Sequence, residues 1–218
     1  MKNNSAKNQS NSEDMPILGK EEINALPLRR YEGPTSLITT ASDLKKAIRK
    51  LKREKLLGFD TETRPSFKKG KSYQPSLVQL AAGNEVFLFH LKHQPLHDGL
   101  LDILSDESII KAGVATNRDV SELRELQPFE PAGFVNIEDK ARNLGFKNQG
   151  LRSMAAVILG FRISKQAQTS NWSRKDLSPT QITYAATDAW VSRELYVALE
   201  KIEKAQKDDP GSSVSISN

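Results

Sequence analysis

The sequence contains no cysteine, and this absence removes several classes of protein at once. Disulfide-stabilised folds, thiolate nucleophiles and zinc sites with cysteine ligands are all excluded. The chain also has no run of about 18 apolar residues, which a membrane-spanning helix requires. Residues 1–14 are polar and lack the apolar stretch of a signal peptide. We therefore expect an intracellular, cytoplasmic protein in a reducing compartment, with no membrane partner.

The chain has 218 residues, which is typical of one ordinary domain with some additional length. Both ends are rich in Asn, Ser and Lys and offer little to bury, so we predict disorder over residues 1–25 and 206–218 and a folded domain over residues 26–205. Lys and Arg outnumber Asp and Glu by 32 to 27, giving a net charge of +5. This excess fits an anionic partner such as nucleic acid, although other soluble proteins carry it too.

Hydrophobic patterning predicts alternating strands and helices. Strands are expected at residues 37–39, 56–61, 76–82, 85–90 and 109–114, and a hairpin turn at 83–84 joins the third to the fourth. Helices are expected from a cap at Ser42, at residues 96–104 and 117–126, and over much of the chain after residue 137. Ser178, Pro179 and Gln181 predict the start of a last helix that ends near Ala205. This order indicates an α/β fold with a central mixed sheet flanked by helices.

Four carboxylates and one phenol stand out against this pattern. Asp60 and Glu62 end a buried strand two positions apart, so their side chains point to the same face. Asp119 falls in the first turn of a later helix, and Tyr184 and Asp188 are four apart on the last one. Each observation has an ordinary structural explanation: a polar strand end, a charge that complements a helix dipole, and a tyrosine at the rim of the core.

The ordered set suggests metal chemistry. Close carboxylates repel one another, and a multivalent cation between them is the usual remedy. Oxygen ligands without Cys or His are those that Mg²⁺ and Mn²⁺ prefer. Two such ions about 3.5–4 Å apart are suited to displacement at phosphorus. We therefore predict two Mg²⁺ or Mn²⁺ ions as cofactors.

The same residues resemble the motifs of the DEDD superfamily of 3′–5′ exonucleases, in the Tyr-containing branch with ribonuclease D and the Werner-syndrome exonuclease domain. The first motif is similar to GFDTE at residues 58–62 and the second to AGVATNRD at 112–119. The third is similar to SNWS at 170–173 followed by YAATDA at 184–189. Thr183 occupies the position at which the other branch carries a histidine. The resemblance covers about residues 42–199.

The resemblance implies a ribonuclease-H-like fold and an enzyme that hydrolyses nucleic acid from the 3′ end to nucleoside monophosphates. It also implies roles for the five residues. Asp60 would bridge both metals, Glu62 and Asp188 would hold the first, and Asp119 would act mainly on the second. Tyr184 would orient the attacking water.

The substrate backbone needs cations near the acids, and a base can stack on an exposed aromatic ring. The candidate contacts are Phe67, Lys68, Lys69, Lys71, Arg118 and Lys165, each of which could equally be an ordinary surface residue. The chain ends soon after the third motif, without the helical nucleic-acid-binding domains that many ribonuclease D proteins and Werner helicases append. We therefore expect tight or processive binding to come from this domain, from partners, or not at all.

Two alternatives remain open at this point. One is a nucleic-acid-binding scaffold built on an inactive nuclease fold, which would be expected to have lost an acid. The other keeps the metal chemistry but acts on small nucleotides or oligoribonucleotides. The sequence does not select DNA over RNA, because contacts to the 2′-hydroxyl depend on the geometry of the pocket.

Overall fold

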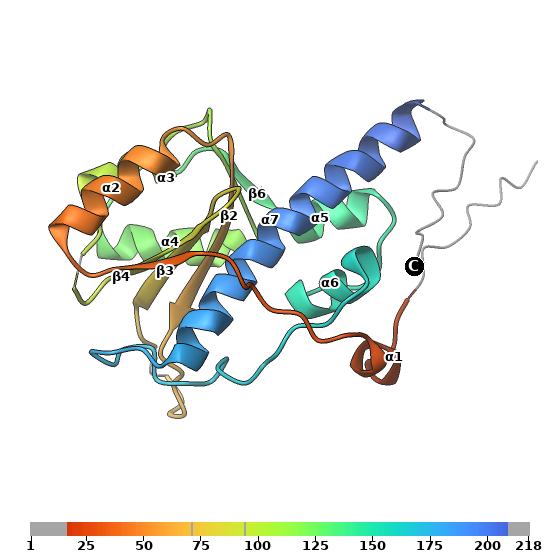
Figure 1. Cartoon of the computed structure of the whole chain (residues 1–218), viewed down its shortest axis with the longest axis horizontal. Helices are drawn as coiled ribbons and strands as arrows, with labels where there is room; N and C mark the ends of the chain where they lie inside the picture. Colours follow the sequence, from red (N-terminus) through yellow and green to blue (C-terminus); the bar gives the residue numbers. More distant parts are fainter. Residues whose placement is uncertain (1–16, 71, 94, 209–218) are drawn as a thin grey trace, which may run out of the picture.

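The computed structural model describes residues 17–70, 72–93 and 95–208. Over these residues a six-stranded sheet forms the centre, in the order β1-β4-β3-β2-β5-β6 (Figure 1). Antiparallel pairing joins β2 to β3 and β3 to β4, and the other neighbours are parallel. The predicted mixed sheet and its hairpin are confirmed. The strands are β1 (Thr35–Ile38), β2 (Leu56–Thr63), β3 (Pro75–Ala81), β4 (Val86–His90), β5 (Ile110–Gly113) and β6 (Phe134–Asn136).

Helices lie on both sides of this sheet (Figure 1). One side carries α2, α3 and α4, and the other is crossed by the long α7 with α5 and α6 beside it. The predicted flanking helices are therefore confirmed, while the short edge strand β6 was not predicted. The helices are α1 (Lys20–Ala25), α2 (Ala41–Leu51), α3 (Asp98–Leu104), α4 (Thr116–Leu126), α5 (Ile137–Asn143), α6 (Leu151–Leu159) and α7 (Pro179–Asp208).

Two apolar layers fill the space between the sheet and its helices. The layer under α2 and α3, here called the α2-side core, buries Phe59, Leu100 and Leu123 among others. The α7-side core contains Leu77, Leu88 and a run of small residues on α7: Ala185, Ala186 and Ala189. Alternation along β2 sends Phe59 to the first layer, which leaves Asp60 facing the second.

Gly58 fixes how closely α7 approaches the sheet. A Cβ atom at this position would lie 1.9 Å from the carbonyl oxygen of Ala189, so any other residue would push the helix away. Small residues on α7 complete the close contact, because a larger side chain at Ala185 or Ala189 would also separate the two elements. The close contact between β2 and α7 therefore depends on glycine and alanine at these positions.

The predicted start of α7 is confirmed in detail. The backbone N–H of Gln181 donates to Ser178 Oγ at 3.2 Å, and the Ser178 N–H donates to Gln181 Oε1 at 3.1 Å. These reciprocal bonds form a capping box. The cap assigned to α2 was wrong: Ser42 lies inside the helix, and Thr40 accepts the N–H of Asp43 instead. Both residues can cap a helix, and the backbone is extended at Thr40.

The predicted disordered ends require correction where the structure describes them. Helix α1 lies within the segment 1–25, and α7 continues through residues 206–208. Residues 1–16 and 209–218 lie outside the described part. Ile23 of α1 is buried, which gives this polar segment one anchor. Residues 26–33, here called the N-terminal strap, follow α1 and cross the outer side of α7 (Figure 1).

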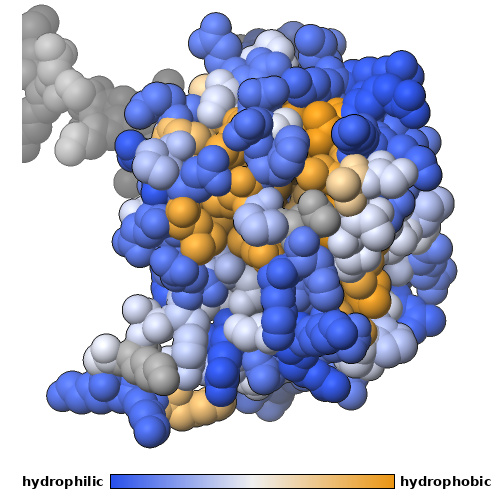
Figure 2. Space-filling model, turned by 90° about the vertical axis from the view of Figure 1, so that its left-hand side faces the viewer, coloured by the Kyte–Doolittle hydropathy of each residue, from blue (hydrophilic) through white to orange (hydrophobic). Residues whose placement is uncertain are grey.

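The surface seen in Figure 2 is mostly hydrophilic, with several hydrophobic areas exposed between polar side chains. Among the described residues the most exposed large apolar side chain is Phe67, at 88%. No helix in the described ranges has both the length and the apolar character needed to cross a membrane.

Candidate active site

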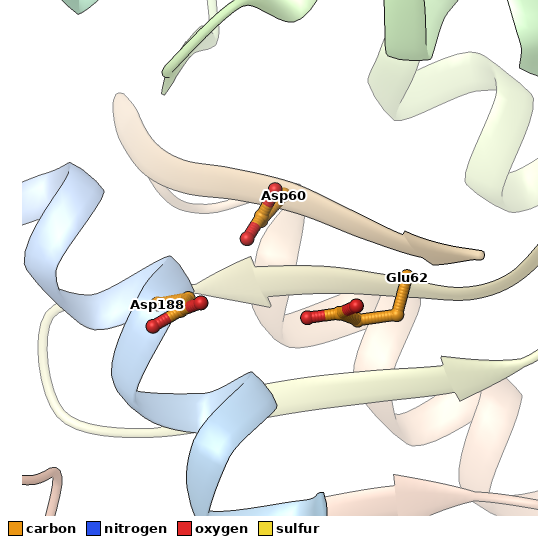
Figure 3. A group of neighbouring side chains, drawn as sticks. All are labelled: Asp60, Glu62 and Asp188. Atoms are coloured by element: carbon orange, nitrogen blue, oxygen red, sulfur yellow. The ribbon is translucent and has the colours of Figure 1, made fainter. Parts of the chain in front are cut away.

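Three carboxylates meet where β2 passes under α7. Asp60 and Glu62 come from the strand and Asp188 from the helix, and one oxygen of each lies within 4.8 Å of the others. Figure 3 shows the three side chains directed toward a common point. The expectation that Asp60 and Glu62 share a face is thereby confirmed, and α7 brings Asp188 to the same face.

Burial and mutual repulsion raise the pKa values of this group. Desolvation is the largest cause for Asp60, followed by the charges of Asp188 and Asp119, and its pKa lies well above the ordinary value. Burial, with Asp60 next, raises the pKa of Glu62 to about 10, and burial raises that of Asp188 to about 7. Without a counter-charge, these groups hold protons at neutral pH instead of ionising together.

The donor set fits a divalent cation. Oδ1 of Asp188 is buried and has no hydrogen-bond partner among the described residues. A buried carboxylate oxygen without a partner is costly unless a cation or a water satisfies it. Closely grouped carboxylate oxygens are the ligands that Mg²⁺ and Mn²⁺ prefer. Asp60, Glu62 and Asp188 are therefore the residues that could hold such an ion.

Tyr184 stands one helical turn before Asp188. Its hydroxyl is hydrogen-bonded to the Asp188 carboxylate and lowers the pKa of that acid. Burial, followed by the charges of Asp188 and Glu62, raises the pKa of the phenol above its ordinary value. Its ring lies 6.0 Å from that of Trp172, which is completely buried. Tyr184 is thus a neutral phenol held in place beside the acids.

Asp119 is close to this group but separate from it. Its Oδ1 accepts a 2.7 Å hydrogen bond from the Thr61 hydroxyl, which fastens α4 to the residue between Asp60 and Glu62. Burial raises its pKa to about 6, while the Thr61 bond opposes the shift. Its charge contributes to the raised pKa values of Asp60 and Glu62. The structure brings three of the four predicted ligands together and places the fourth at the edge.

A cleft of about 390 Å³ opens over the acids. Lys165 lines it, as do Gln149, Arg152 and Gln168, which the sequence analysis did not select. Arg152 also donates to Asn24 of α1. Gly150 and Leu151, at the start of α6, also line the cleft. Two cationic and two amide side chains thus line the cleft, together with apolar residues such as Ile163.

The other predicted substrate contacts that the structure describes lie outside the cleft lining. Phe67, Lys68 and Lys69 are exposed on the loop after β2, and Lys71 falls outside the described residues. Arg118 pairs with Glu122 at 2.8 Å on the surface of α4. Contact between any of these residues and nucleic acid stays a prediction.

Comparison with known proteins gives a consistent result. The family described as 3′–5′ exonuclease matches residues 35–203. A ribonuclease D from Gluconacetobacter diazotrophicus is 32% identical over 178 residues, which cover 79% of this chain and 44% of that protein. The mouse bifunctional 3′–5′ exonuclease/ATP-dependent helicase WRN is 31% identical over 150 residues, which cover 66% of this chain and 11% of that protein. This chain thus spans less than half the length of either relative.

Solved structures share the fold. Ribonuclease D of Trypanosoma brucei, crystallised in complex with RNA U12, superposes with a TM-score of 0.69 at 22% identity. The superposition covers 82% of this chain and 65% of that one. At this level of identity the likeness establishes the α/β architecture and no more.

Proposed function

This chain belongs to the family of 3′–5′ exonucleases, and we propose that it removes nucleotides one at a time from the 3′ end of a nucleic-acid strand. The chain has the ribonuclease-H-like fold of that family. Hydrolysis would release nucleoside monophosphates and depend on divalent cations. The observation that carries the proposal is the convergence of Asp60, Glu62 and Asp188 at one point.

The acids would hold two cations, Mg²⁺ or Mn²⁺. Asp60 would be shared, Glu62 and Asp188 would hold the first ion, and Asp119 would act mainly on the second. When bound, such ions lower the pKa of water and stabilise the charge that develops at phosphorus and on the leaving oxygen. Asp119 Oδ1 is bonded to the Thr61 hydroxyl, and Asp119 would have to approach the other three acids to become a ligand. With a pKa of about 6, Asp119 is largely ionised at neutral pH, as a carboxylate ligand must be.

Tyr184 would position the water that attacks phosphorus. A phenol with a raised pKa keeps its proton at neutral pH, so it orients a nucleophile better than it removes a proton from one. Packing against Trp172 and the hydrogen bond to Asp188 fix its ring and its hydroxyl. A fixed donor beside the acids lowers the entropic cost of aligning the water.

The substrate would be DNA, RNA or both, with a free 3′ end. The T. brucei relative was crystallised with RNA, and the net charge of +5 favours an anionic strand. Lys165 in the cleft would contact the phosphates nearest the acids. Phe67, Lys68 and Lys69 would contact the strand further away, where an exposed ring can stack on any base.

Digestion of end-labelled strands tests this function. Single-stranded and recessed DNA and RNA, each carrying a 5′ label, are incubated with Mg²⁺ or Mn²⁺, and Asp188→Asn serves as the matched control. A ladder that shortens progressively is expected, and EDTA or the control variant should prevent it. Release of the 5′-terminal nucleotide first, or cleavage at a comparable rate in EDTA, would contradict the proposal.

A further inference from the structure

A second cavity lies on the outer side of α7, under the N-terminal strap. Its volume is about 980 Å³, compared with about 390 Å³ for the catalytic cleft. The strap forms one wall, and the loop before α7 together with the first turns of α7 forms the other. Cavities of about 300–1,000 Å³ are the size that ligand sites in proteins usually have. The cavity is large enough for a nucleotide.

The strap that forms this wall is fastened at both ends. The N–H of Arg29 donates to the Arg162 carbonyl at 2.9 Å, and the N–H of Arg162 donates to Pro27 at 3.0 Å. Further along, the N–H of Tyr31 donates to Thr187 Oγ1 at 3.0 Å. The hydroxyl of Thr187 in turn donates to the Thr183 carbonyl. The cavity is therefore built into the fold and does not require a conformational change to form.

The cavity and the catalytic cleft are neighbours. Ser164 and Tyr184 line both of them, so they meet at the phenol beside the acids. The strap precedes residue 35, where the match to the exonuclease family begins. One wall of the cavity is thus supplied by residues outside the part of the chain that the family shares.

Chemistry suited to a nucleotide lines the cavity. The Arg29 guanidinium has no ion-pair partner among the described residues, while Arg30 lies 3.7 Å from Glu32 in an exposed pair. Tyr31 and Trp190 face the same space with ring centres 6.0 Å apart. Guanidinium groups bind phosphate, and aromatic faces stack on bases without regard to sequence.

We propose that this cavity binds the nucleotides upstream of the scissile bond. The proposal rests on the proposed function, because a strand whose 3′ end lies at Asp60 and Asp188 must leave the cleft on one side. Tyr184 and Ser164 mark a side on which a preformed cavity continues from the cleft. Arg29 and Arg30 contact the upstream phosphates, and Tyr31 and Trp190 offer rings to the bases. A dinucleotide without a 5′ phosphate lacks those phosphates and gains nothing from the two arginines.

Substrates of two lengths test the subsite. KM and kcat are measured for a dinucleotide and a ten-nucleotide strand with the full chain and with the double variant Arg29→Ala, Arg30→Ala. The matched control is Lys45→Ala, Lys46→Ala, which removes two exposed charges from α2 on the other side of the sheet. In the arginine variant KM for the ten-nucleotide strand should rise about tenfold, and KM for the dinucleotide should stay at the control value. The proposal would be overturned if the arginine variant and the lysine control had the same KM for the ten-nucleotide strand as well as the same KM for the dinucleotide.

Binding without turnover separates this proposal from the proposed function. Fluorescence anisotropy of a labelled ten-nucleotide strand is measured in the Asp188→Asn background, with and without the Arg29→Ala, Arg30→Ala substitutions. Each protein is titrated over a range of salt concentrations. Each phosphate contact to a single strand contributes about 0.7 to the slope of log K against log salt concentration. Loss of two contacts should therefore make the slope shallower by about 1.4. An unchanged slope overturns the subsite even if the enzyme digests nucleic acid. A changed slope supports the subsite even if no hydrolysis is detected.

A second variant distinguishes loss of binding from loss of folding. Thr180→Glu places a negative charge in the cavity, yet it adds an acid to the first turn of α7, where the helix dipole favours one. The melting temperature should stay at or above that of the wild type while affinity for the ten-nucleotide strand falls. Full affinity in a stably folded Thr180→Glu protein would contradict the proposal.

Discussion

The two sides of the sheet differ in whether their buried polar groups are hydrogen-bonded. On the α2 side the buried Lys111 donates to the Asp106 carbonyl at 2.6 Å, and the surrounding layer is apolar. On the α7 side, buried polar atoms without a hydrogen-bond partner in the described chain include Asp188 Oδ1, both amide atoms of Gln79 and Trp172 Nε1. Gln79 lies directly opposite Asp60 on β3. Gln79 and Asp188 therefore leave buried polar atoms beside Asp60 that have no partner in the described ranges.

This difference separates the residues that stabilise the fold from those that make the site. A satisfied apolar layer can supply the free energy of folding, whereas close carboxylates with raised pKa values oppose it. Functional sites commonly break the local rules that the rest of a protein obeys. The α2 side can thus be regarded as the support for a destabilised site on the other side. The following predictions test this division, beginning with the largest effect.

Removing a clustered acid should have the largest effect. Asp60→Asn or Asp188→Asn deletes a negative ligand, so we expect kcat to fall at least about 10³-fold. The same change relieves repulsion in the metal-free protein, which should therefore melt at the same or a higher temperature. Kinetics and thermal melting in EDTA measure both quantities. A variant that loses activity because it unfolds would show that the acids serve the fold.

A cavity on the α2 side should affect stability alone. Leu100 is buried in that core, and Leu100→Ala should cost about 2–5 kcal/mol of the free energy of unfolding. Urea denaturation measures the loss, and kcat of the folded fraction should match the wild type. A fall in kcat comparable to that of Asp188→Asn would contradict the separation of the two sides.

Tyr184→Phe tests the role of the phenol. The change keeps the ring packing against Trp172 and removes one hydroxyl, so we expect kcat to fall by roughly 10–10³-fold. Metal affinity and melting temperature should barely change, because no clustered ligand is lost. Full activity would make Tyr184 a packing residue, and unfolding would give its hydroxyl a structural role.

The smallest expected effect is a pH dependence of the metal-free protein. Folding raises the pKa of Asp188 to about 7 and that of Glu62 to about 10, so the folded state holds more protons than the unfolded state. The stability that these protonated acids contribute is therefore fully present below about pH 4 and is lost as pH rises through about 7 for Asp188 and about 10 for Glu62. Melting temperatures in EDTA from pH 5 to 8 should decrease, and less steeply for Asp188→Asn. Saturating Mg²⁺ should oppose the decrease, since cations replace the protons.

Much of this site could be predicted because its residues follow simple periodicities. Alternation along a strand places Asp60 and Glu62 on one face, and the four-residue spacing of a helix places Tyr184 beside Asp188. The position of Asp119 could not be predicted in the same way. Its hydrogen bond to Thr61 depends on how α4 packs against β2, which no local pattern records.

The fold was least predictable where its elements are short or polar. Strand β6 has three residues and forms only by pairing with β5. Helix α1 and the strap are held by a few contacts with distant residues, such as the bond from Tyr31 to Thr187. Such tertiary contacts override composition, which favoured disorder for the segment containing α1.

The arrival of Asp188 on the last helix has a consequence for the order of events during protein synthesis. A nascent chain that extends only to residue 178 already contains Asp60, Glu62 and Asp119 but neither Tyr184 nor Asp188. The three-carboxylate group cannot assemble until α7 has left the ribosome and docked against Gly58. Because chains are made from the N-terminus, the group is completed only after the chain has been made through Asp188. A nascent chain that stops before α7 therefore contains three of the five candidate residues but cannot bring Asp188 to Asp60 and Glu62.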